Sequence, residues 1–308
     1  MIVYDGDANW FKDIFHFWKS KTLSYLFLRV LLIGSLCFVG CYLLLNYANV
    51  EEVISPALFT WIGAALSVLL VFRTNTAYDR WWEGRKHWGH LVNTSRSLAF
   101  LIDSKISKED VGNRAFFARY ISNYAFALSA HLRGIDVMEK MKGMSEKELD
   151  TLKTFYHKPN FIAKTLYNRV LDLRKQGRLG EFEELKLLDH LGEFNNVTGA
   201  CERIKNTPIP FSYNTYLKIF ILIYTTSLPI AYVNILGYYT IPLAMFEFFF
   251  LIGLEMMAEE IEDPFDNRDN DLPTRTIATN IQHNVYEILD MADKVERPKV
   301  ADLYEAIY

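Results

Sequence analysis

Several features are scarce in this 308-residue chain, and each scarcity argues against a class of protein. There are only three cysteines, and two of them, Cys37 and Cys41, lie one helical turn apart, so a disulfide framework is not indicated. The formal net charge is -4, and no basic patch is interleaved with aromatic residues, which argues against a nucleic-acid partner. No secretory signal peptide is evident, because charged residues precede the first apolar run and no small-residue cleavage site follows it.

Charge is also almost absent from four long blocks of the sequence. These are residues 25–47, 56–72, 219–239 and 241–257, in which the only charged residues are Arg29, Glu247 and Glu255. A bilayer core of ~30 Å requires roughly 20 residues of helix. Two blocks are short for a span and each could be a buried helix of a soluble core, but four blocks in one chain favour a membrane protein. Because strand signals are scarce, we expect an all-α fold with four transmembrane helices.

The loops between these blocks predict the orientation of the chain. Residues 46–55 contain no lysine or arginine, and the turn around Gly237 contains no charge, whereas lysine and arginine flank the other ends of the blocks. Positively charged loops tend to stay in the cytoplasm. We therefore expect a multi-pass protein of the cell inner membrane with both termini in the cytoplasm.

This orientation divides the chain into five segments. They are an N-terminal cytosolic segment (1–24), the first two membrane helices with a cytosolic extension of the second (25–103), a cytosolic helical region (104–210), the third and fourth membrane helices (211–258), and a C-terminal acidic loop and helix (259–308).

Local signals predict where the helices of the middle region begin and end. Apolar residues at three- and four-residue steps predict a helix over 114–133, Ser145 with Glu148 forms a capping box, and a further helix is expected over 157–175. Another helix should run to about Ile204, before two prolines bend the chain in 207–210.

A proline inside the third apolar block predicts a kinked helix. Pro229 follows Thr225, Thr226 and Ser227, whose hydroxyls are expected to help satisfy the carbonyls that the proline frees.

The second apolar block has a composition suited to close helix packing. Gly63, Ala64, Ala65 and Ser67 are small residues, which let helices approach closely. If several copies of this helix surrounded an axis, Ala64, Val68 and Phe72, at four-residue spacing, would line it with apolar side chains. Such a lining gates by dewetting. The alternative is that these residues pack within one subunit. After Phe72 the helix is expected to leave the bilayer without a break, because the sequence becomes densely charged.

Motifs along nearly the whole chain resemble those of the bestrophin family of ion channels, in its bacterial branch. They are FRTNTAYDRWWEGRKHWG from Phe72, CERIKNTPIPFSY at 201–213, SLP at 227–229, and EDPF followed by NDLP within 262–273. The resemblance implies a homopentamer around a central pore that conducts small monovalent ions: chloride and other anions in animal members, with cations as the alternative in bacterial ones. It also implies a hydrophobic neck at Ala64, Val68 and Phe72 and a cytosolic constriction at Phe182. The family generally has larger side chains at the first two neck positions, so this neck is expected to be wider.

An acidic run follows the fourth block and is a second candidate site. Calcium takes six to eight oxygen ligands, and animal bestrophins bind calcium at the corresponding place. Here Arg268 falls at or near an expected ligand position and would repel the ion. The alternative is structural: the acidic side chains cap helices and pair with Arg73, Arg80 or Arg275. The candidate residues are Glu260, Asp263, Asp266 and Asp271. No cofactor is otherwise required.

The other ionisable clusters carry weaker signals. Arg29 and Glu255 are expected to pair or to reach the cytoplasmic interface, while Glu247 lies deep enough to need a partner. A membrane-embedded carboxylate-metal enzyme using Glu247, Glu255, Glu259 and Glu260 is the alternative function, but the four blocks contain no Glu-x-x-His pair. His87 and His90 lie one turn apart without an apparent third metal ligand. We therefore expect a channel and no enzyme; a non-conducting membrane scaffold is the other alternative.

Overall fold

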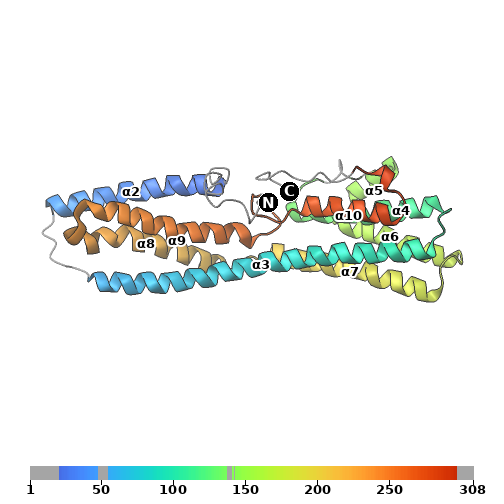
Figure 1. Cartoon of the computed structure of the whole chain (residues 1–308), viewed down its shortest axis with the longest axis horizontal. Coiled ribbons are helices and arrows are strands. Elements are labelled where there is room, and N and C mark those ends of the chain that lie inside the picture. The colour runs from blue at the N-terminus through green and yellow to red at the C-terminus, as the bar shows by residue number, and fades with distance from the viewer. Residues whose placement is uncertain (1–20, 48–54, 137–140, 142, 297–308) are drawn as a thin grey trace. The chain divides into compact units, whose positions relative to one another are not determined.

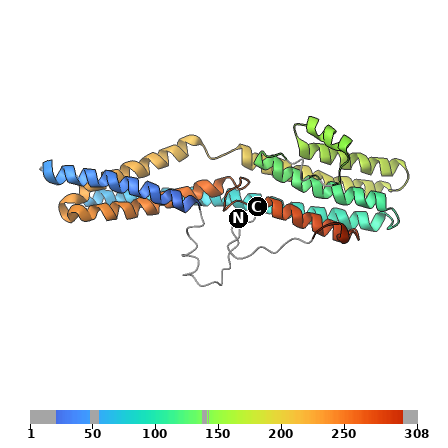
Figure 2. The same cartoon turned by 90° about the horizontal axis from the view of Figure 1, so that it is seen from above.

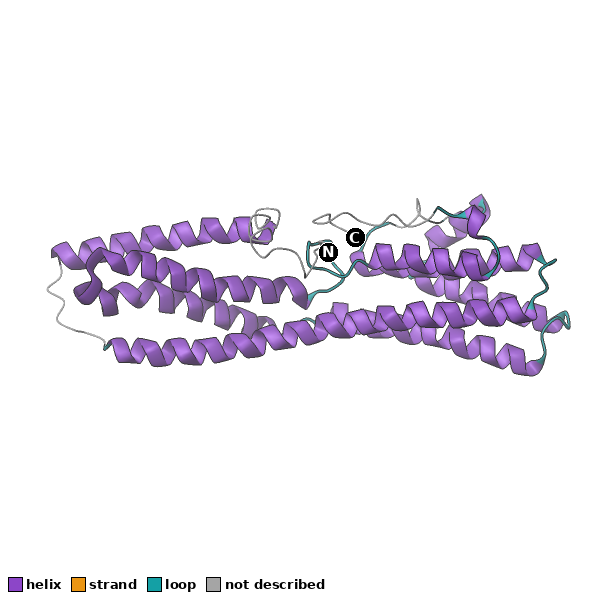
Figure 3. Cartoon of the chain, in the orientation of Figure 1, coloured by secondary structure: helices purple, strands orange, loops and turns teal. Residues whose placement is uncertain are grey.

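The computed structural model describes residues 21–47, 55–136, 141 and 143–296, and every element in these ranges is helical (Figure 3). Most of the predicted segment 1–24 and of the loop 46–55 lies outside the described residues. The elements are α2 (Lys21–Tyr47), α3 (Pro56–Lys105), α4 (Val111–Arg133), α5 (Glu146–Thr154), α6 (Lys158–Lys175), α7 (Glu181–Asn206), α8 (Phe211–Leu236), η3 (Gly237–Tyr239), α9 (Thr240–Glu262), α10 (Thr274–Ile288) and η4 (Ala292–Lys294).

The chain folds as two compact units. One, here called the apolar unit, contains the described residues up to Arg80 together with Pro208–Asp263. The other, the polar unit, contains Trp81–Thr207 and the described residues from Pro264 onward. Helix α3 is 50 residues long and continuous, so its first half belongs to the apolar unit and its second half to the polar unit. The prediction that this helix continues past Phe72 is confirmed.

Four helical segments build the apolar unit. Helix α2 packs against both α8 and α9, and α8 packs against α9 (Figures 1 and 2). Buried aliphatic residues such as Ile33, Leu66 and Ile221 form its core. Three stretches among the described residues are long and apolar enough to cross a bilayer: Tyr25–Tyr47, Pro56–Lys105 and Phe211–Glu262.

The third of these stretches is not one straight helix. It contains α8 and α9, of 26 and 23 residues, which are joined by the short 3-10 turn η3. The turn begins at Gly237, whose φ of 54° favours glycine. At 1.5 Å per residue, α8 and α9 are about 39 Å and 35 Å long, so each is long enough for a bilayer core.

Inside α8, Pro229 removes one backbone N–H donor. The three hydroxyls expected to satisfy the carbonyl that it frees bond to other carbonyls instead. The hydroxyls of Thr225, Thr226 and Ser227 donate hydrogen bonds to carbonyls one turn earlier, those of Ile221, Leu222 and Ile223. The carbonyl freed by Pro229 is that of Thr225, four residues before it. This oxygen accepts a hydrogen bond from the thiol of Cys37, on α2, with a sulfur-to-oxygen distance of 3.8 Å. A neighbouring helix therefore supplies the donor.

The polar unit packs around α4, which contacts α6, α7 and α10. Its core is mostly aliphatic, and its largest side chains are aromatic. The buried Tyr124 ring stacks on Phe194 and donates its hydroxyl proton to the Phe194 carbonyl at 2.7 Å. Burial raises the pKa of Tyr124 well above its ordinary value, so its hydroxyl stays protonated. The other large core side chains include Trp88, Phe117 and Phe265.

The local signals of the middle region are confirmed. The helix expected over 114–133 is α4. Ser145 and Glu148 form the predicted capping box at the start of α5. Helix α6 begins at Lys158, with His157 as its N-cap, and α7 ends at Asn206, just before the two prolines.

Candidate functional site

The face of α3 that contains Ala64, Val68 and Phe72, here called the α3 face, is exposed. Val68 and Phe72 are 55% and 60% exposed, and Ala64 is exposed as well. The buried side of the same helix carries Leu66, Leu70 and Arg73 instead. The interpretation that Ala64, Val68 and Phe72 pack within one subunit is therefore wrong. They are available to contact lipid, water or another copy of the chain.

Gly63, on α3, makes room for the side chain of Tyr224, on α8. A Cβ atom added at Gly63 would lie 2.6 Å from the hydroxyl oxygen of Tyr224, which is too close for real side chains. The close helix packing expected for the small residues of this block stays a prediction. Tyr224 in turn donates its hydroxyl proton to Glu247, on α9. The contact fixes the helix that presents the α3 face.

Directly after the face, at Arg73, a buried carboxylate connects three segments of the apolar unit. Glu262, at the end of α9, has an Oε2 atom 2.7 Å from Nη2 of Arg73 and 3.4 Å from Nδ2 of Asn214. Its Oε1 accepts the backbone N–H of Ile209 at 2.7 Å, and its carbonyl accepts Nε–H of Arg80 at 3.0 Å. Glu262 was absent from the predicted acidic set. Arg73 therefore pairs with Glu262 and not, as predicted, with a member of that set.

The predicted acidic residues do not form one cluster. Glu260 is buried on α9, and Asp263 is the C-cap of that helix. In the polar unit, Asp266 pairs with Arg268 at 3.3 Å, and Asp271 accepts the Arg268 backbone N–H at 2.6 Å. Arg268 thus lies among the acids, as the sequence indicated. Within the described residues, none of these acids belongs to a group of three close metal-type ligands.

The acids of the last membrane block are engaged separately. Glu255 lies 3.6 Å from Lys218, which also pairs with Glu259 at 2.8 Å. The partner of Glu255 is therefore Lys218, not the Arg29 expected from the sequence. Glu247 lines a cavity of about 300 Å³ together with Tyr224 and Ser67. Neither Glu247 nor Glu255 belongs to a close group of three metal-type ligands in the described part of the chain. The ligand set of a carboxylate-metal enzyme is therefore not assembled by these residues.

Phe182, the predicted second constriction, is the second residue of α7. Its ring is 69% exposed, and Nζ of Lys186 lies 5.8 Å from the ring centre. An exposed aromatic side chain at a helix start is available to another copy of the chain or to solvent. Sequence reasoning placed it by the neighbouring turn alone, and the turn is present, with Gly177 at a φ of 70°.

Comparison with known proteins supports the resemblance seen in the motifs. The family profile described as "Bacterial/Fungal Bestrophin protein" matches residues 1–287. The chain belongs to the bacterial and fungal bestrophin family. Bestrophins of this branch are therefore its relatives, and the family expected from the motifs is confirmed.

Individual relatives cover almost the whole chain. It is 31% identical over 298 residues to the voltage-dependent anion channel-forming protein YneE of Escherichia coli K12, with 96% of both chains covered. It is 29% identical over 293 residues to the protein RSc3414 of Ralstonia nicotianae, which bears the same description, with 94% of both covered.

A solved structure shares the fold. The crystal structure of a bacterial bestrophin homologue from Klebsiella pneumoniae matches with a TM-score of 0.80 and 26% identity, covering 86% of this chain and 98% of that one. As a bestrophin with long apolar helices, this chain is an all-helical membrane protein.

Proposed function

We propose that this bestrophin assembles as a homopentamer and conducts small monovalent anions through a central pore. The observation that carries the proposal is the α3 face: Ala64, Val68 and Phe72 project from the subunit while the opposite side of α3 is buried. The description of its relatives as voltage-dependent anion channel-forming proteins supports an anion as the permeant species.

In the proposed pore, the α3 face of each subunit forms a hydrophobic neck. Its side chains offer no hydrogen bond and no charge to an ion, so the neck controls flow through its hydration. Phe72 is the largest of the three and Ala64 the smallest. We therefore propose that the neck narrows toward Phe72. An ion passes when water fills this ring.

The topology completes the proposal. Helices α2, α3, α8 and α9 cross the cell inner membrane, with α8 and α9 counted separately, and both termini lie in the cytoplasm. The boundaries are those expected above: 1–24, 25–103, 104–210, 211–258 and 259–308. The lysine-free and arginine-free loop before α3 supports an external position for that end of the helix.

Phe182 and the acidic loop take further roles in this proposal. Phe182 forms a second constriction in the cytosolic part of the pore, which its exposure supports. For Glu260, Asp263, Asp266 and Asp271 we favour a structural role over calcium binding. The pairing of Arg268 with Asp266 supports this choice, because the guanidinium of Arg268 already places a positive charge in the acidic loop.

Recordings from purified protein in planar bilayers test the function. Under a KCl gradient, an anion-selective pore gives a reversal potential close to the chloride equilibrium potential. A reversal potential near that of potassium would instead support cation conduction. Absence of current would favour the non-conducting scaffold. Mass measurement in detergent tests the pentamer, with five chain masses of 35.9 kDa each expected.

Metal analysis of the same preparation tests the enzyme alternative. A carboxylate-metal enzyme at Glu247 and Glu255 would bind transition metal that is lost when both are changed to glutamine. The proposed pore requires no metal at these positions.

A further inference from the structure

Three side chains from distant parts of the sequence meet in the polar unit. They are His131 in the last turn of α4, His157 at the N-cap of α6, and Glu202 in α7. One oxygen, Oε1 of Glu202, lies 2.7 Å from Nε2 of His131 and 2.7 Å from Nε2 of His157. The two imidazole ring centres are 4.4 Å apart, and all three side chains are partly buried.

We propose that His131, His157 and Glu202 bind a Zn²⁺ ion. Two imidazole nitrogens and one carboxylate oxygen are a ligand set that zinc accepts in tetrahedral geometry, with a water as the fourth ligand. Tetrahedral zinc with bonds of about 2.0–2.1 Å holds its ligand atoms roughly 3.3 Å apart. Each imidazole nitrogen therefore has to move only about half an ångström farther from the Glu202 oxygen, which side-chain rotation provides. Calcium and magnesium prefer oxygen ligands, and the two imidazoles disfavour them.

Glu202 offers a single carboxylate oxygen to both imidazoles. The neighbouring Cys201 is not one of the residues whose ligand atoms lie within 4.8 Å of one another in this group. The ligand set is therefore limited to the three residues named.

Zinc binding at His157 is expected to break a hydrogen bond at the N-cap of α6. Nδ1 of His157 accepts the backbone N–H of Asn160 at 3.1 Å, so without metal the ring proton of neutral His157 is on Nε2. Zinc bound at Nε2 takes that position, and the proton moves to Nδ1, where it opposes the Asn160 N–H. The cap hydrogen bond is lost. Because a cap contributes much less than a structural zinc site, the exchange favours metal binding.

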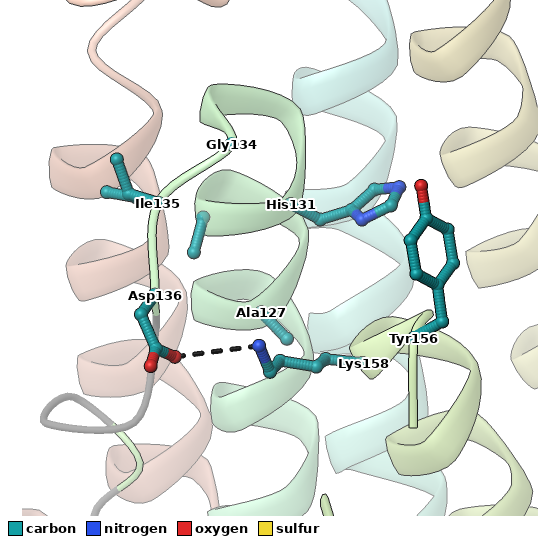
Figure 4. A pocket seen from close by; sticks show the side chains of 8 residues that line it. Ala127, His131, Gly134, Ile135, Asp136, Tyr156 and Lys158 are labelled. Carbon is teal, nitrogen blue, oxygen red and sulfur yellow. Dashed lines mark ion pairs between the residues drawn. The ribbon is translucent and has the colours of Figure 1, made fainter. Parts of the chain in front are cut away.

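A cavity borders His131, one of the three proposed ligands. It has a volume of about 380 Å³, and its wall includes His131 and Tyr156 (Figure 4). Lys158 and Asp136 pair across another part of the wall at 3.5 Å (Figure 4). A cavity of this size has room for the water that completes the zinc coordination. Bound zinc would join α4, α6 and α7, and its binding is independent of conduction at the α3 face.

Zinc binding to the untagged full-length protein in detergent tests the inference. After treatment with a chelator, equilibrium dialysis against ZnCl2 is expected to give one high-affinity zinc per chain, unaffected by millimolar calcium or magnesium. Glu202→Gln and His157→Asn should each weaken binding at least tenfold. Asparagine is also a strong N-cap residue, so His157→Asn removes the ligand and keeps the cap of α6. His131→Asn provides a further ligand variant.

A matched histidine serves as the control. His90 lies 2.9 Å from Glu193 in an exposed pair that has no second imidazole among the close metal-type groups of the described residues. His90→Asn should leave zinc affinity unchanged. In the wild type, zinc should also speed hydrogen exchange at the Asn160 amide, and it should not do so in Glu202→Gln. Unchanged affinity in both Glu202→Gln and His157→Asn, or less than one high-affinity zinc per chain, would overturn the proposal.

Discussion

The guanidinium of Arg73 lies 2.7 Å from the carboxylate of Glu262, 189 positions later in the chain, and both side chains are buried. Two of the arginine nitrogens, Nε and Nη1, make no hydrogen bond within the described residues. Glu262 therefore supplies the contact that compensates the buried charge. Because Phe72 precedes Arg73 directly, this ion pair fixes the rotation of α3 at the end of the α3 face.

Removing one partner of this pair should destabilise the protein strongly. Glu262→Gln removes the carboxylate charge that contacts the buried Arg73 guanidinium, and breaking a buried ion pair typically costs about 3–5 kcal/mol. Thermal unfolding in detergent, followed by the loss of monodisperse protein, is expected to show a large decrease in midpoint temperature.

An exposed pair provides the control for that experiment. Arg203 lies 2.5 Å from Glu83, and both side chains are accessible to solvent. Arg203→Ala should cost less than about 1 kcal/mol, because solvent screens exposed pairs. Equal effects of Glu262→Gln and Arg203→Ala would contradict the role given to the buried pair.

Shortening the largest side chain of the α3 face should widen the proposed neck. Phe72→Ala is expected to increase single-channel conductance several-fold, because a wider apolar ring holds water more easily. The matched substitution Phe38→Ala, on α2, changes a ring that is 53% exposed but lies outside the α3 face. Bilayer recordings should show wild-type conductance for Phe38→Ala. An unchanged conductance in Phe72→Ala would argue against a neck at this position.

The thiol of Cys37 should stabilise α8 only while Pro229 is present. Cys37→Ala is expected to lower stability by about 1 kcal/mol, since the Thr225 carbonyl loses its donor, while Cys37→Ser keeps one. Pro229→Ala restores a backbone N–H for the same carbonyl. In a double-mutant cycle, Cys37→Ala should therefore cost less in the Pro229→Ala background. Additive effects in thermal unfolding would show that the two residues act separately.

Asp110, the N-cap of α4, should make stability depend on pH. Burial favours a higher pKa, but hydrogen bonds from Asn113 and the charge of Arg178 outweigh it and lower the pKa. A lowered pKa means that the charged form contributes stability above the ordinary value of 3.8, and that this contribution is lost as the pH falls through the folded-state pKa.

The substitution Asp110→Asn isolates that charge, because asparagine also caps helices. Thermal unfolding should show a less stable variant at pH 7 and a difference from wild type that shrinks as the pH falls below about 3.8 and disappears below the folded-state pKa. Asp172→Asn changes an exposed carboxylate 3.9 Å from Lys175 and should have little effect at any pH. A difference between Asp110→Asn and wild type that stays constant over this range would contradict the assignment.

Features set by neighbouring residues were predictable from the sequence. The capping box of Ser145 and Glu148, the start of α6 at Lys158 and the break at the two prolines depend on spacings of a few residues. The four-residue spacing of the α3 face was also visible, and its exposure follows from the burial of the opposite side of the helix. Such features need no knowledge of tertiary contacts.

Contacts between distant segments could not be predicted in the same way. Glu262 looked like one acid among many, and only the folded chain brings it to Arg73. His87 and His90, the histidine pair noted in the sequence, do not share a partner. Each pairs with a different exposed carboxylate. The group that converges is His131, His157 and Glu202, whose members are separated by 26 and 45 positions, so no spacing rule reveals it.

The central claim, that the α3 face lines the conduction pathway, is tested most directly by thiol modification at Val68. The native cysteines at 37, 41 and 201 are buried, so wild-type current should resist a charged, water-soluble methanethiosulfonate reagent. Val68→Cys should be blocked by the reagent, whereas Val39→Cys, at a residue of similar exposure on α2, should not. Current through Val68→Cys that is unaffected by the reagent, or equally affected in Val39→Cys, would contradict the account.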